Sequence, residues 1–460
     1  MDARLQAAFA AIVGAPHVLT DAADTSSYTR DWRRQYAAPA LAVLRPDTTT
    51  EVAAVVALCA REGVAVVPQG GNTGLSGGSV PTGARREIVL SLGRLNRIRE
   101  VDALNDTITA EAGCVLAQVQ KAAEDAGRLF ALSLAAEGSC QVGGNLSTNA
   151  GGVNVLRYGN AREQVLGLEV VLPDGRVWNG LRALRKDNTG YDLKQLFIGA
   201  EGTLGVITAA VLRLQPRPSA TATAWVCVPA PAQAVELLAH VHRRCGERVS
   251  AFELLSRPCV DAVLRHSPGA RDPLPGRGAW FVLVEMADVG TDAQLAELLQ
   301  RELAEAFDNG IAVDAAIAKS GAERAAMWAI RETVPEAQFA NVKHDVSVPV
   351  SRVPALIERA GAALAAAFPG APVYAFGHIG DGNIHYNVGD EALIGRRDEV
   401  NRLVFGVVDA LDGSISAEHG LGQLKRESVR EHKAALELEL MRALKSALDP
   451  RGLMNPGKVL

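Results

Sequence analysis

The sequence predicts an α+β protein built from two parts with different residue patterns. Residues 1–216 combine short apolar strands and helices with dense clusters of glycine. Residues 217–415 contain fewer glycines and alternate apolar strands with amphipathic helices, which predicts an antiparallel sheet with helices on one face. The sequence Gln215-Pro216-Arg217-Pro218 marks the boundary, because proline interrupts regular structure. Residues 416–460 form a C-terminal segment.

The first part opens with a strand-helix-strand unit. Residues 41–44 and 64–67 are the two short apolar strands. Thr48 and Glu51 have the spacing of a capping box, which predicts the start of the intervening helix, and Gly63 predicts its end. A unit of this minimal length favours two parallel strands.

The first part contains three glycine-rich loops, of which the first directly follows a strand and the third leads into one. They lie at 68–78, 137–152 and 199–207. Glycine permits backbone conformations in which successive N–H groups line an anion site, and phosphate is the natural ligand. The first loop is neither a dinucleotide fingerprint nor a Walker loop. Two such loops about seventy residues apart indicate a long ligand that contains a diphosphate.

Further elements are predicted from apolar periodicity and turn residues. Pro335 is expected to end or kink the helix that precedes it. The remaining strands are expected at 88–91, 97–101, 107–110, 165–172, 176–178, 207–214, 222–228, 280–286, 311–316, 346–350, 373–377 and 384–388. The remaining helices are expected at 116–126, 232–244, 294–306, 322–331 and 436–448.

A cluster of potential metal ligands lies in the second part. His378 and His385 flank a Gly-Asp-Gly turn at 380–382, and the turn brings the two imidazoles face to face. Two facing imidazoles form a metal site when a third ligand arrives. Glu418 can supply an oxygen ligand and leaves His419 beside the metal. The alternative is that both histidines are ordinary hydrogen-bonded residues of a hairpin.

Composition excludes several classes of protein. The 460 residues are 48% hydrophobic and carry a net charge of −5, without a basic run, which argues against a nucleic-acid partner. Six cysteines without a C-x-x-C pair predict reduced, buried thiols in a cytoplasmic protein. No apolar run is long enough to span a bilayer. The apolar stretch at 7–15 follows Asp2 and Arg4, which favours an amphipathic helix over a signal peptide.

Six motifs together resemble one family over essentially the whole chain. They are PQGGNTGLSGG, GGNLSTNAGG, GAEGTLGVIT, GHIGDGNIHYN, SAEHGLG and the terminal MNPGK. The chain resembles the FAD-dependent D-2-hydroxyacid dehydrogenases of the vanillyl-alcohol-oxidase fold, the group of D-2-hydroxyglutarate dehydrogenase and flavin-linked D-lactate dehydrogenase. The resemblance implies a two-part FAD-binding domain at 1–216, a substrate or cap domain with the metal site at 217–415, and a segment at 416–460 that returns to the FAD domain.

The resemblance also implies how FAD is held. Backbone around Gly70–Gly74 would hold the diphosphate, the later loops would hold the flavin, and Asn455 would approach the flavin ring. No histidine lies between His17 and His240, and the first loop has no cysteine, so we expect non-covalent FAD. The residues implied to contact FAD are Pro68, Gly70, Gly71, Asn72, Thr73, Gly74, Gly77, Gly78, Gly138, Ser139, Gly143, Gly144, Asn145, Thr148, Asn149, Gly151, Gly152, Glu201, Gly205, Ile207 and Asn455.

The metal and its neighbour follow from the same resemblance. It implies that His378, His385 and Glu418 are ligands of a divalent cation, Zn²⁺ or Mn²⁺, and that His419 is the catalytic base. A metal bound to a hydroxyl lowers the pKa of that hydroxyl, which a neighbouring imidazole can then deprotonate.

The substrate contacts are also implied by the family. Arg331 and Lys343 match carboxylate-binding residues, and Asn387 matches a substrate-contacting asparagine. D-2-hydroxyglutarate dehydrogenases have a threonine four residues after that arginine, where this chain has Pro335. The change removes one hydrogen-bonding group from the substrate site.

The function expected from these features is oxidation of D-2-hydroxyglutarate, and also of D-malate, to the 2-oxo acid by hydride transfer to flavin N5. The alternatives within the family are a D-lactate dehydrogenase and a glycolate oxidase subunit. From other classes, the histidine cluster fits a zinc hydrolase, and the loops fit a non-catalytic flavin-binding subunit. The chain has no NAD(P) fingerprint or iron–sulfur cysteine spacing, so the expected electron acceptor is an electron-transfer flavoprotein or a quinone. A homodimer is compatible with the sequence.

Overall fold

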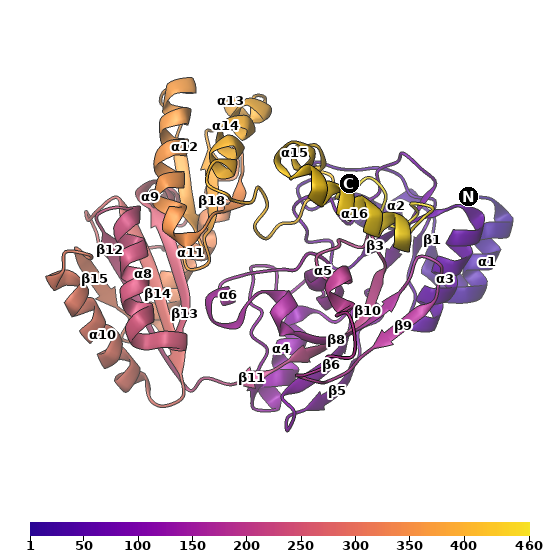
Figure 1. The fold of residues 1–460 in the computed structure, drawn as a ribbon, viewed down its shortest axis with the longest axis horizontal. Helices are drawn as coiled ribbons and strands as arrows, with labels where there is room; N and C mark the ends of the chain where they lie inside the picture. The colour runs from indigo at the N-terminus through magenta and orange to yellow at the C-terminus, as the bar shows by residue number, and fades with distance from the viewer. The chain divides into compact units, whose positions relative to one another are not determined.

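The computed structural model describes residues 1–460, and the chain folds into two compact units (Figure 1). Unit 1 comprises Met1–Gly151, Asn160–Arg217 and Glu418–Leu460, and unit 2 comprises Gly152–Gly159 and Pro218–Ala417. The sequence analysis placed residues 152–159 with the first part, whereas they belong to unit 2.

The first sheet of unit 1 carries the first glycine loop at the end of one of its strands, β3. Its order is β1-β2-β4-β3, and both β2 and β3 pair with β4 in parallel. The strands predicted at 41–44 and 64–67 are therefore parallel, but they are not neighbours, because β4 lies between them. The four strands are β1 (Val18–Leu19), β2 (Val43–Leu44), β3 (Ala65–Gln69) and β4 (Glu87–Ser91).

The second sheet of unit 1 is antiparallel and has the order β5-β6-β10-β8-β9. A short ladder between β7 (Arg128–Leu129) and β11 (Gln215–Pro216) lies apart from it. The five strands are β5 (Ile98–Asp102), β6 (Thr107–Glu111), β8 (Val165–Val171), β9 (Val177–Gly180) and β10 (Val206–Arg213).

Helix α3 shows how local signals set the ends of an element. The Thr48 hydroxyl accepts a hydrogen bond from the backbone N–H of Glu51 at 3.1 Å, and Gly63 ends the helix with φ 67°. The predicted cap is therefore confirmed. The helices of unit 1 are α1 (Ala3–Val13), α2 (Ala22–Thr29), α3 (Thr49–Glu62), α4 (Leu116–Asp125), α5 (Val142–Ser147), α7 (Lys194–Phe197), α15 (Arg426–His432) and α16 (Ala435–Leu448).

Unit 2 is organised around one seven-stranded sheet of order β15-β12-β14-β13-β17-β18-β16, in which every pair is antiparallel. Its fourth strand, β13, was not expected from the sequence, and the strand predicted at 311–316 begins three residues later. The strands are β12 (Ala220–Val228), β13 (Val249–Ser256), β14 (Trp280–Asp288), β15 (Asp314–Ile317), β16 (Asp345–Ser347), β17 (Val373–Gly377) and β18 (Asn383–Val388).

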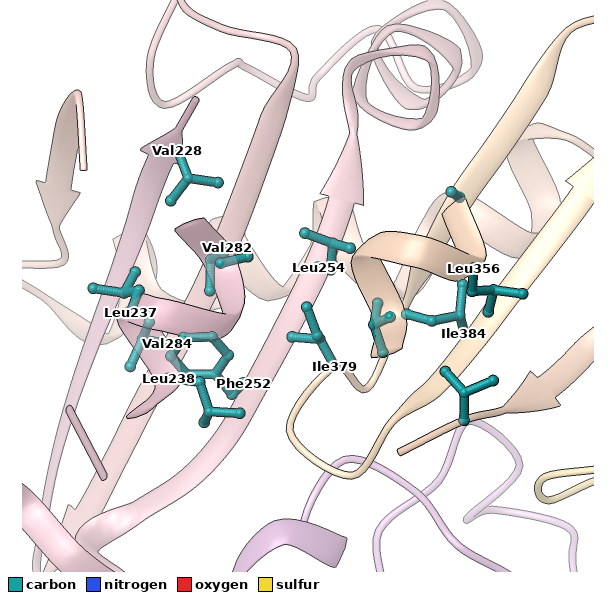
Figure 2. Packing of buried hydrophobic residues seen from close by; sticks show 14 of the residues in the cluster. Val228, Leu237, Leu238, Phe252, Leu254, Val282, Val284, Leu356, Ile379 and Ile384 are labelled. Atoms are coloured by element: carbon teal, nitrogen blue, oxygen red, sulfur yellow. The ribbon is translucent and has the colours of Figure 1, made fainter. Parts of the chain in front are cut away.

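Helices cover both faces of this sheet, so the prediction of helices on one face is wrong. Side chains of β13 alternate between two apolar clusters, because successive residues of a strand point to opposite faces. Phe252 and Leu254 pack with residues of α8, α10, α12 and α14, as Figure 2 shows in part. Ala251 and Leu255 pack with residues of α9 and α11. The helices of unit 2 are α6 (Val155–Tyr158), α8 (Pro231–Cys245), α9 (Arg257–His266), α10 (Asp292–Asp308), α11 (Gly321–Ala337), α12 (Val353–Ala367), α13 (Glu391–Ile394) and α14 (Arg397–Asp409).

Helix α11 continues through Pro335, so of the two expected outcomes, an end or a kink of the helix, the end at that residue is wrong. Proline has no N–H group, so the carbonyl of Arg331 receives no helical hydrogen bond from residue 335. The buried face of α11, which includes Trp328, Arg331 and Val334, keeps the helix against the sheet through this defect.

All six cysteines are free and buried, as predicted. Burial raises the pKa of the Cys59 and Cys259 thiols to about 12. In no helix is the apolar run long enough to cross a lipid bilayer. The cytoplasmic location stays a prediction.

Lys458 generates a test of stability against pH. Its side chain is 2% exposed, and its ammonium group has no hydrogen-bond partner. Burial lowers the pKa of this group to about 8, and the Glu87 charge opposes the shift only in part. Because the unfolded chain holds this proton more tightly, protonated Lys458 destabilises the fold below about pH 8, and the penalty disappears toward pH 10.5. We expect Lys458→Met to stabilise the protein by about 1–3 kcal/mol at pH 7.

The measurement is urea unfolding of both proteins at pH 7 and pH 10, where the difference should shrink. Lys445→Met is the matched control, because the Lys445 ammonium donates to the Thr203 carbonyl, the Asp449 carboxylate and the Met454 carbonyl. That variant should be destabilised. A Lys458→Met protein less stable than the parent at pH 7 would contradict this account.

Candidate active site

The two histidines of the predicted cluster lie together in unit 2. Strands β17 and β18 form an antiparallel hairpin in which Phe376 pairs with His385, and His378 follows directly after β17. Their ring centroids are 5.9 Å apart and the rings are nearly perpendicular, so the two imidazoles lie next to each other as expected, but edge to face. Gly377 allows the tight return of the chain, because its φ of 146° and its 2.6 Å from a hypothetical Cβ to the Asn383 carbonyl exclude a side chain.

Glu253 connects the histidine hairpin to helix α11. One oxygen of its carboxylate lies 2.6 Å from Nδ1 of His378, and the other accepts a hydrogen bond from Nε of Arg331 at 2.6 Å. The side chain of Glu253 is 1% exposed. Burial raises the pKa of this carboxyl, but its contacts with His378 and Arg331 outweigh burial and lower the pKa to about 2. Glu253 is therefore a buried carboxylate with two partners.

The sequence analysis missed Glu253, although a signal was present. It is the only charged residue in the apolar strand Val249–Ser256, where an ionised side chain needs a buried partner. A strand with a single carboxylate at its centre is the pattern that could have identified it.

The second histidine, His385, lies beside another buried carboxylate. Asp345 on β16 is its cross-strand neighbour, with 4.0 Å between the Asp345 oxygen and Nδ1 of His385. Asn383 donates a hydrogen bond to the same oxygen at 3.0 Å. The ring of Phe376 packs against His385 with 4.9 Å between centroids. Asp345 was not among the predicted site residues.

The three predicted substrate-binding residues all belong to unit 2. Arg331 uses Nε for Glu253, and its guanidinium lies 5.1 Å from the ring centroid of Phe376. Lys343 donates to the carbonyl of Gln338 at 3.1 Å. Asn387 accepts from the backbone N–H of His344 and donates to the side-chain oxygen of Gln338, each at 3.1 Å. The Asn387 amide thus has structural partners within unit 2.

Glu418 and His419 open the last segment of unit 1 and lie 3.5 Å apart between the Glu418 carboxylate and Nε2 of His419. The preceding residue, Ala417, ends unit 2 and donates its backbone N–H to the Asp345 carbonyl at 3.2 Å. The predicted ligands are therefore divided between the two units. His378 and His385 lie in unit 2. Glu418 lies in unit 1 and directly follows Ala417, whose backbone N–H binds the Asp345 carbonyl.

Within unit 1, the segment after His419 is fixed to the first glycine loop. The Ser76 hydroxyl donates to the carbonyls of His419 and Gly420 at 3.1 and 3.3 Å. The buried carboxylate of Glu201 accepts from the backbone N–H groups of Leu421 and Gly422 at 2.7 and 2.8 Å. Both carboxylate oxygens of Glu201 thus bind the backbone of this segment. The contact between Glu201 and FAD stays a prediction.

The glycines of the loops fall into two groups. A Cβ at Gly71 would lie 2.1 Å from the Ser139 carbonyl, and one at Gly143 would lie 2.7 Å from Cβ of Ala112, so these positions need glycine for close packing. Gly74, Gly138 and Gly144 have no atom within 4 Å of such a Cβ and face open space. The second group offers exposed backbone for a phosphate-bearing ligand.

Several other predicted cofactor residues have structural partners in unit 1. The side chain of Asn72 bonds the carbonyls of Ser27 and Arg30, and the Thr148 hydroxyl bonds the Gly144 carbonyl. Others pack in the core or shape turns: Pro68 lies against Gly202, Gly205 lies against Val170, Ile207 is buried, and Asn149 accepts from the Arg162 N–H. Gly152 belongs to unit 2.

Two buried side-chain oxygens near the first glycine loop, those of Asn455 and Gln141, have no hydrogen-bond partner within the chain. Asn455 donates its amide N–H groups to the carbonyls of Gly78 and Glu201 at 2.9 and 2.6 Å, while its side-chain oxygen is unpaired. The side-chain oxygen of Gln141, beside Gly70, is also unpaired. Buried acceptors of this kind need a donor. They fit a flavin, whose ring carries an N–H group, as the open glycines fit its diphosphate.

Comparison with known proteins defines the class. Residues 40–180 match the family described as FAD binding domain, and residues 217–459 match the family described as FAD linked oxidases, C-terminal domain. The p-cresol methylhydroxylase structure with bound substrate superimposes with a TM-score of 0.78 at 17% identity, and the match covers 99% of this chain and 96% of that chain. The molecule is thus an FAD-binding protein with the vanillyl-alcohol-oxidase fold.

Two relatives of similar sequence identify the family within this fold class. The mitochondrial D-2-hydroxyglutarate dehydrogenase of Bos taurus is 41% identical, with 96% of this chain and 81% of that protein covered. The D-2-hydroxyglutarate dehydrogenase of Xanthomonas citri pv. viticola is 39% identical, with 97% and 95% covered. The chain therefore belongs to the FAD-dependent D-2-hydroxyacid dehydrogenases, as the resemblance implied.

The two groups of glycine predict different effects of the same substitution. Gly71→Ala places a methyl group against the Ser139 carbonyl, so we expect a lower melting temperature even without FAD. Gly74→Ala meets no atom, so the FAD-free protein should melt at an unchanged temperature. The measurement is thermal unfolding of FAD-free and FAD-loaded protein. Equal destabilisation of both variants would disprove the distinction.

Proposed function

We propose that the protein oxidises D-2-hydroxyglutarate to 2-oxoglutarate, with non-covalent FAD as the hydride acceptor and a bound divalent cation as an essential group. D-malate is a second substrate of the same reaction. The observation that supports this proposal best is the buried network in which His378 and Arg331 share Glu253, with His385 next to His378. This network brings two imidazoles and a guanidinium close together in unit 2. The chain belongs to a family of 2-hydroxyacid dehydrogenases, whose substrates carry a hydroxyl and a carboxylate.

His378, His385 and Glu418 are the proposed ligands of the cation, Zn²⁺ or Mn²⁺. Imidazole and carboxylate are the donors that such metals use in catalytic sites, and three protein ligands leave positions for a substrate. These three side chains would hold the cation, which would supply the positive charge that lowers the pKa of a substrate hydroxyl. Glu418 directly follows Ala417 in the chain, and the backbone N–H of Ala417 donates to the carbonyl of Asp345, which lies on the strand paired with that of His385.

His419 accepts the hydroxyl proton at a ring nitrogen. Its Nε2 lies 3.5 Å from the Glu418 carboxylate, and its carbonyl is held by Ser76. A base next in sequence to a metal ligand is placed close to the hydroxyl that the metal binds. FAD, when bound, would supply the hydride acceptor for the substrate carbon.

Arg331 and Lys343 bind the carboxylates of the substrate. The bond from Nε of Arg331 to Glu253 leaves the two terminal nitrogens in the forked arrangement that matches a carboxylate. The positive charge of Lys343, in addition to that of Arg331, suits a dicarboxylate such as D-2-hydroxyglutarate better than it suits the monocarboxylate D-lactate. The two relatives described above carry the name D-2-hydroxyglutarate dehydrogenase, which supports the same choice.

The electron acceptor that we propose is an electron-transfer flavoprotein or a quinone, because the sequence has no NAD(P) fingerprint and no iron–sulfur cysteine spacing. A D-lactate dehydrogenase, a glycolate oxidase subunit and a zinc hydrolase are the competing functions. A substrate screen distinguishes them.

The decisive measurement is anaerobic bleaching of the bound flavin by D- and L-2-hydroxy acids. We expect D-2-hydroxyglutarate to bleach the flavin fastest and D-malate next, and we expect the L-enantiomers to be inactive. Faster bleaching by D-lactate or glycolate would replace the proposed substrate. A protein that never bleaches with any hydroxy acid would reject the oxidation itself.

Removal of the metal tests the role of the cation separately. Dialysis against a chelator should abolish bleaching while FAD stays bound, since the cation and FAD have separate proposed ligands. Added Zn²⁺ or Mn²⁺ should restore the reaction. Full activity in metal-free protein would refute the metal requirement.

Arg331→Ala tests carboxylate binding. A charge-assisted hydrogen bond is worth roughly 1.5–3 kcal/mol, so kcat/KM for D-2-hydroxyglutarate should fall by about ten- to a hundred-fold. Arg324→Ala is the matched control, because Arg324 lies on the same helix and forms the same kind of ion pair, with Glu285. That control should lose stability but keep its KM. Unchanged kinetics of Arg331→Ala would remove Arg331 from the site.

A further inference from the structure

We propose that Glu253 is a positioning residue that sets His378 for metal binding and Arg331 for substrate binding through the two oxygens of a single carboxylate. The proposal rests on the proposed function, because it assigns Glu253 to the same site. Neither the motifs nor the predicted ligand set includes this residue, which lies more than a hundred positions before His378 in the sequence.

The contact with His378 decides which ring nitrogen carries the proton. The Glu253 oxygen lies 2.6 Å from Nδ1, and an ionised carboxylate can only accept a hydrogen bond. The neutral imidazole therefore holds its proton on Nδ1 and keeps its lone pair on Nε2, the nitrogen that a metal would take. A carboxylate behind a histidine ligand fixes both the tautomer and the orientation of the ring.

The contact with Arg331 decides which nitrogens face the substrate. Nε is bonded to the second oxygen of Glu253 at 2.6 Å, and the guanidinium is stacked near the ring of Phe376. A planar guanidinium held at Nε cannot rotate freely, so its terminal pair is presented in one direction. One side chain thereby fixes the relative placement of the metal ligand and the carboxylate ligand.

Glu253 is not simply a stabilising partner of helix α11, because the sheet offers a comparison. Glu285 on the neighbouring strand β14 is also buried and also pairs with an arginine of α11, Arg324. Its remaining bonds go to Trp328 and Thr223, and none goes to a histidine. The two glutamates thus share an anchoring role, and only Glu253 adds a contact with a proposed metal ligand.

The substitution Glu253→Gln separates these roles. A glutamine has only one side-chain acceptor, and the permanently charged Arg331 will claim it. The amide N–H groups then face Nδ1 of His378, which favours the opposite tautomer and puts the proton on Nε2. We expect the affinity for Zn²⁺ to fall by about ten- to a hundred-fold, the range found for residues behind metal ligands.

The experiment uses FAD-loaded full-length protein, stripped of metal and titrated with Zn²⁺ against a chromophoric chelator. KM and kcat for D-2-hydroxyglutarate are measured at saturating Zn²⁺, where KM should rise several-fold because a neutral amide oxygen holds the Arg331 guanidinium less firmly than a carboxylate does. Glu285→Gln is the matched control, and it should lower stability while leaving the Zn²⁺ affinity and KM unchanged. Zn²⁺ affinity of Glu253→Gln within twofold of the parent would overturn the proposal.

A second variant keeps the test decisive if Glu253→Gln does not fold. Glu253→Asp keeps the charge but withdraws the carboxylate by one methylene, so it cannot reach both partners, and it should weaken Zn²⁺ binding or raise KM. Parental values of both would also overturn the proposal. Zn²⁺ binding is measured without substrate, so failure of the substrate assignment leaves this result interpretable. Absence of Zn²⁺ binding by the parent would reject the metal role of His378 and, with it, this role of Glu253.

Discussion

Two ion pairs with buried carboxylates hold helix α11 to the sheet of unit 2, and the geometry of the proposed site depends on them. Arg324 pairs with Glu285, and Arg331 pairs with Glu253, from adjacent strands. A buried carboxylate is costly unless every lone pair finds a donor, so these contacts tolerate little change in the position of the helix. The proposed site is thus attached to the sheet through these contacts. The charge of Arg331 is already paired with Glu253 before any substrate binds.

In unit 1, the glycine-rich loops leave part of the backbone exposed, where a long ligand can bind. Close-packed glycines such as Gly71 bring the first two loops together, and other glycines, among them Gly74 and Gly138, face open space. The C-terminal segment completes this surface, because Asn455 bonds the Gly78 and Glu201 carbonyls and keeps one acceptor unpaired. Residues distant in sequence therefore form one polar lining.

Sequence reasoning succeeded where the signal was local and failed where a distant partner decided the outcome. The cap at Thr48 and the adjacent imidazoles of His378 and His385 depend on neighbours in sequence, and both were predicted. Glu253 was missed because its role is set by residues far along the chain. Helix α11 passes through Pro335 because tertiary packing outweighs one lost hydrogen bond. The order of the first sheet likewise depends on β4, which no local pattern could place between β2 and β3.

The six buried thiols have a consequence for a protein whose flavin cycles between oxidation states. Reduced flavins that meet oxygen release peroxide, and peroxide attacks thiolates that solvent can reach. Burial excludes solvent from the cysteines and, by raising the pKa of Cys59 and Cys259 to about 12, keeps those two protonated. The buried thiols are thereby protected from peroxide that forms when the reduced flavin meets oxygen.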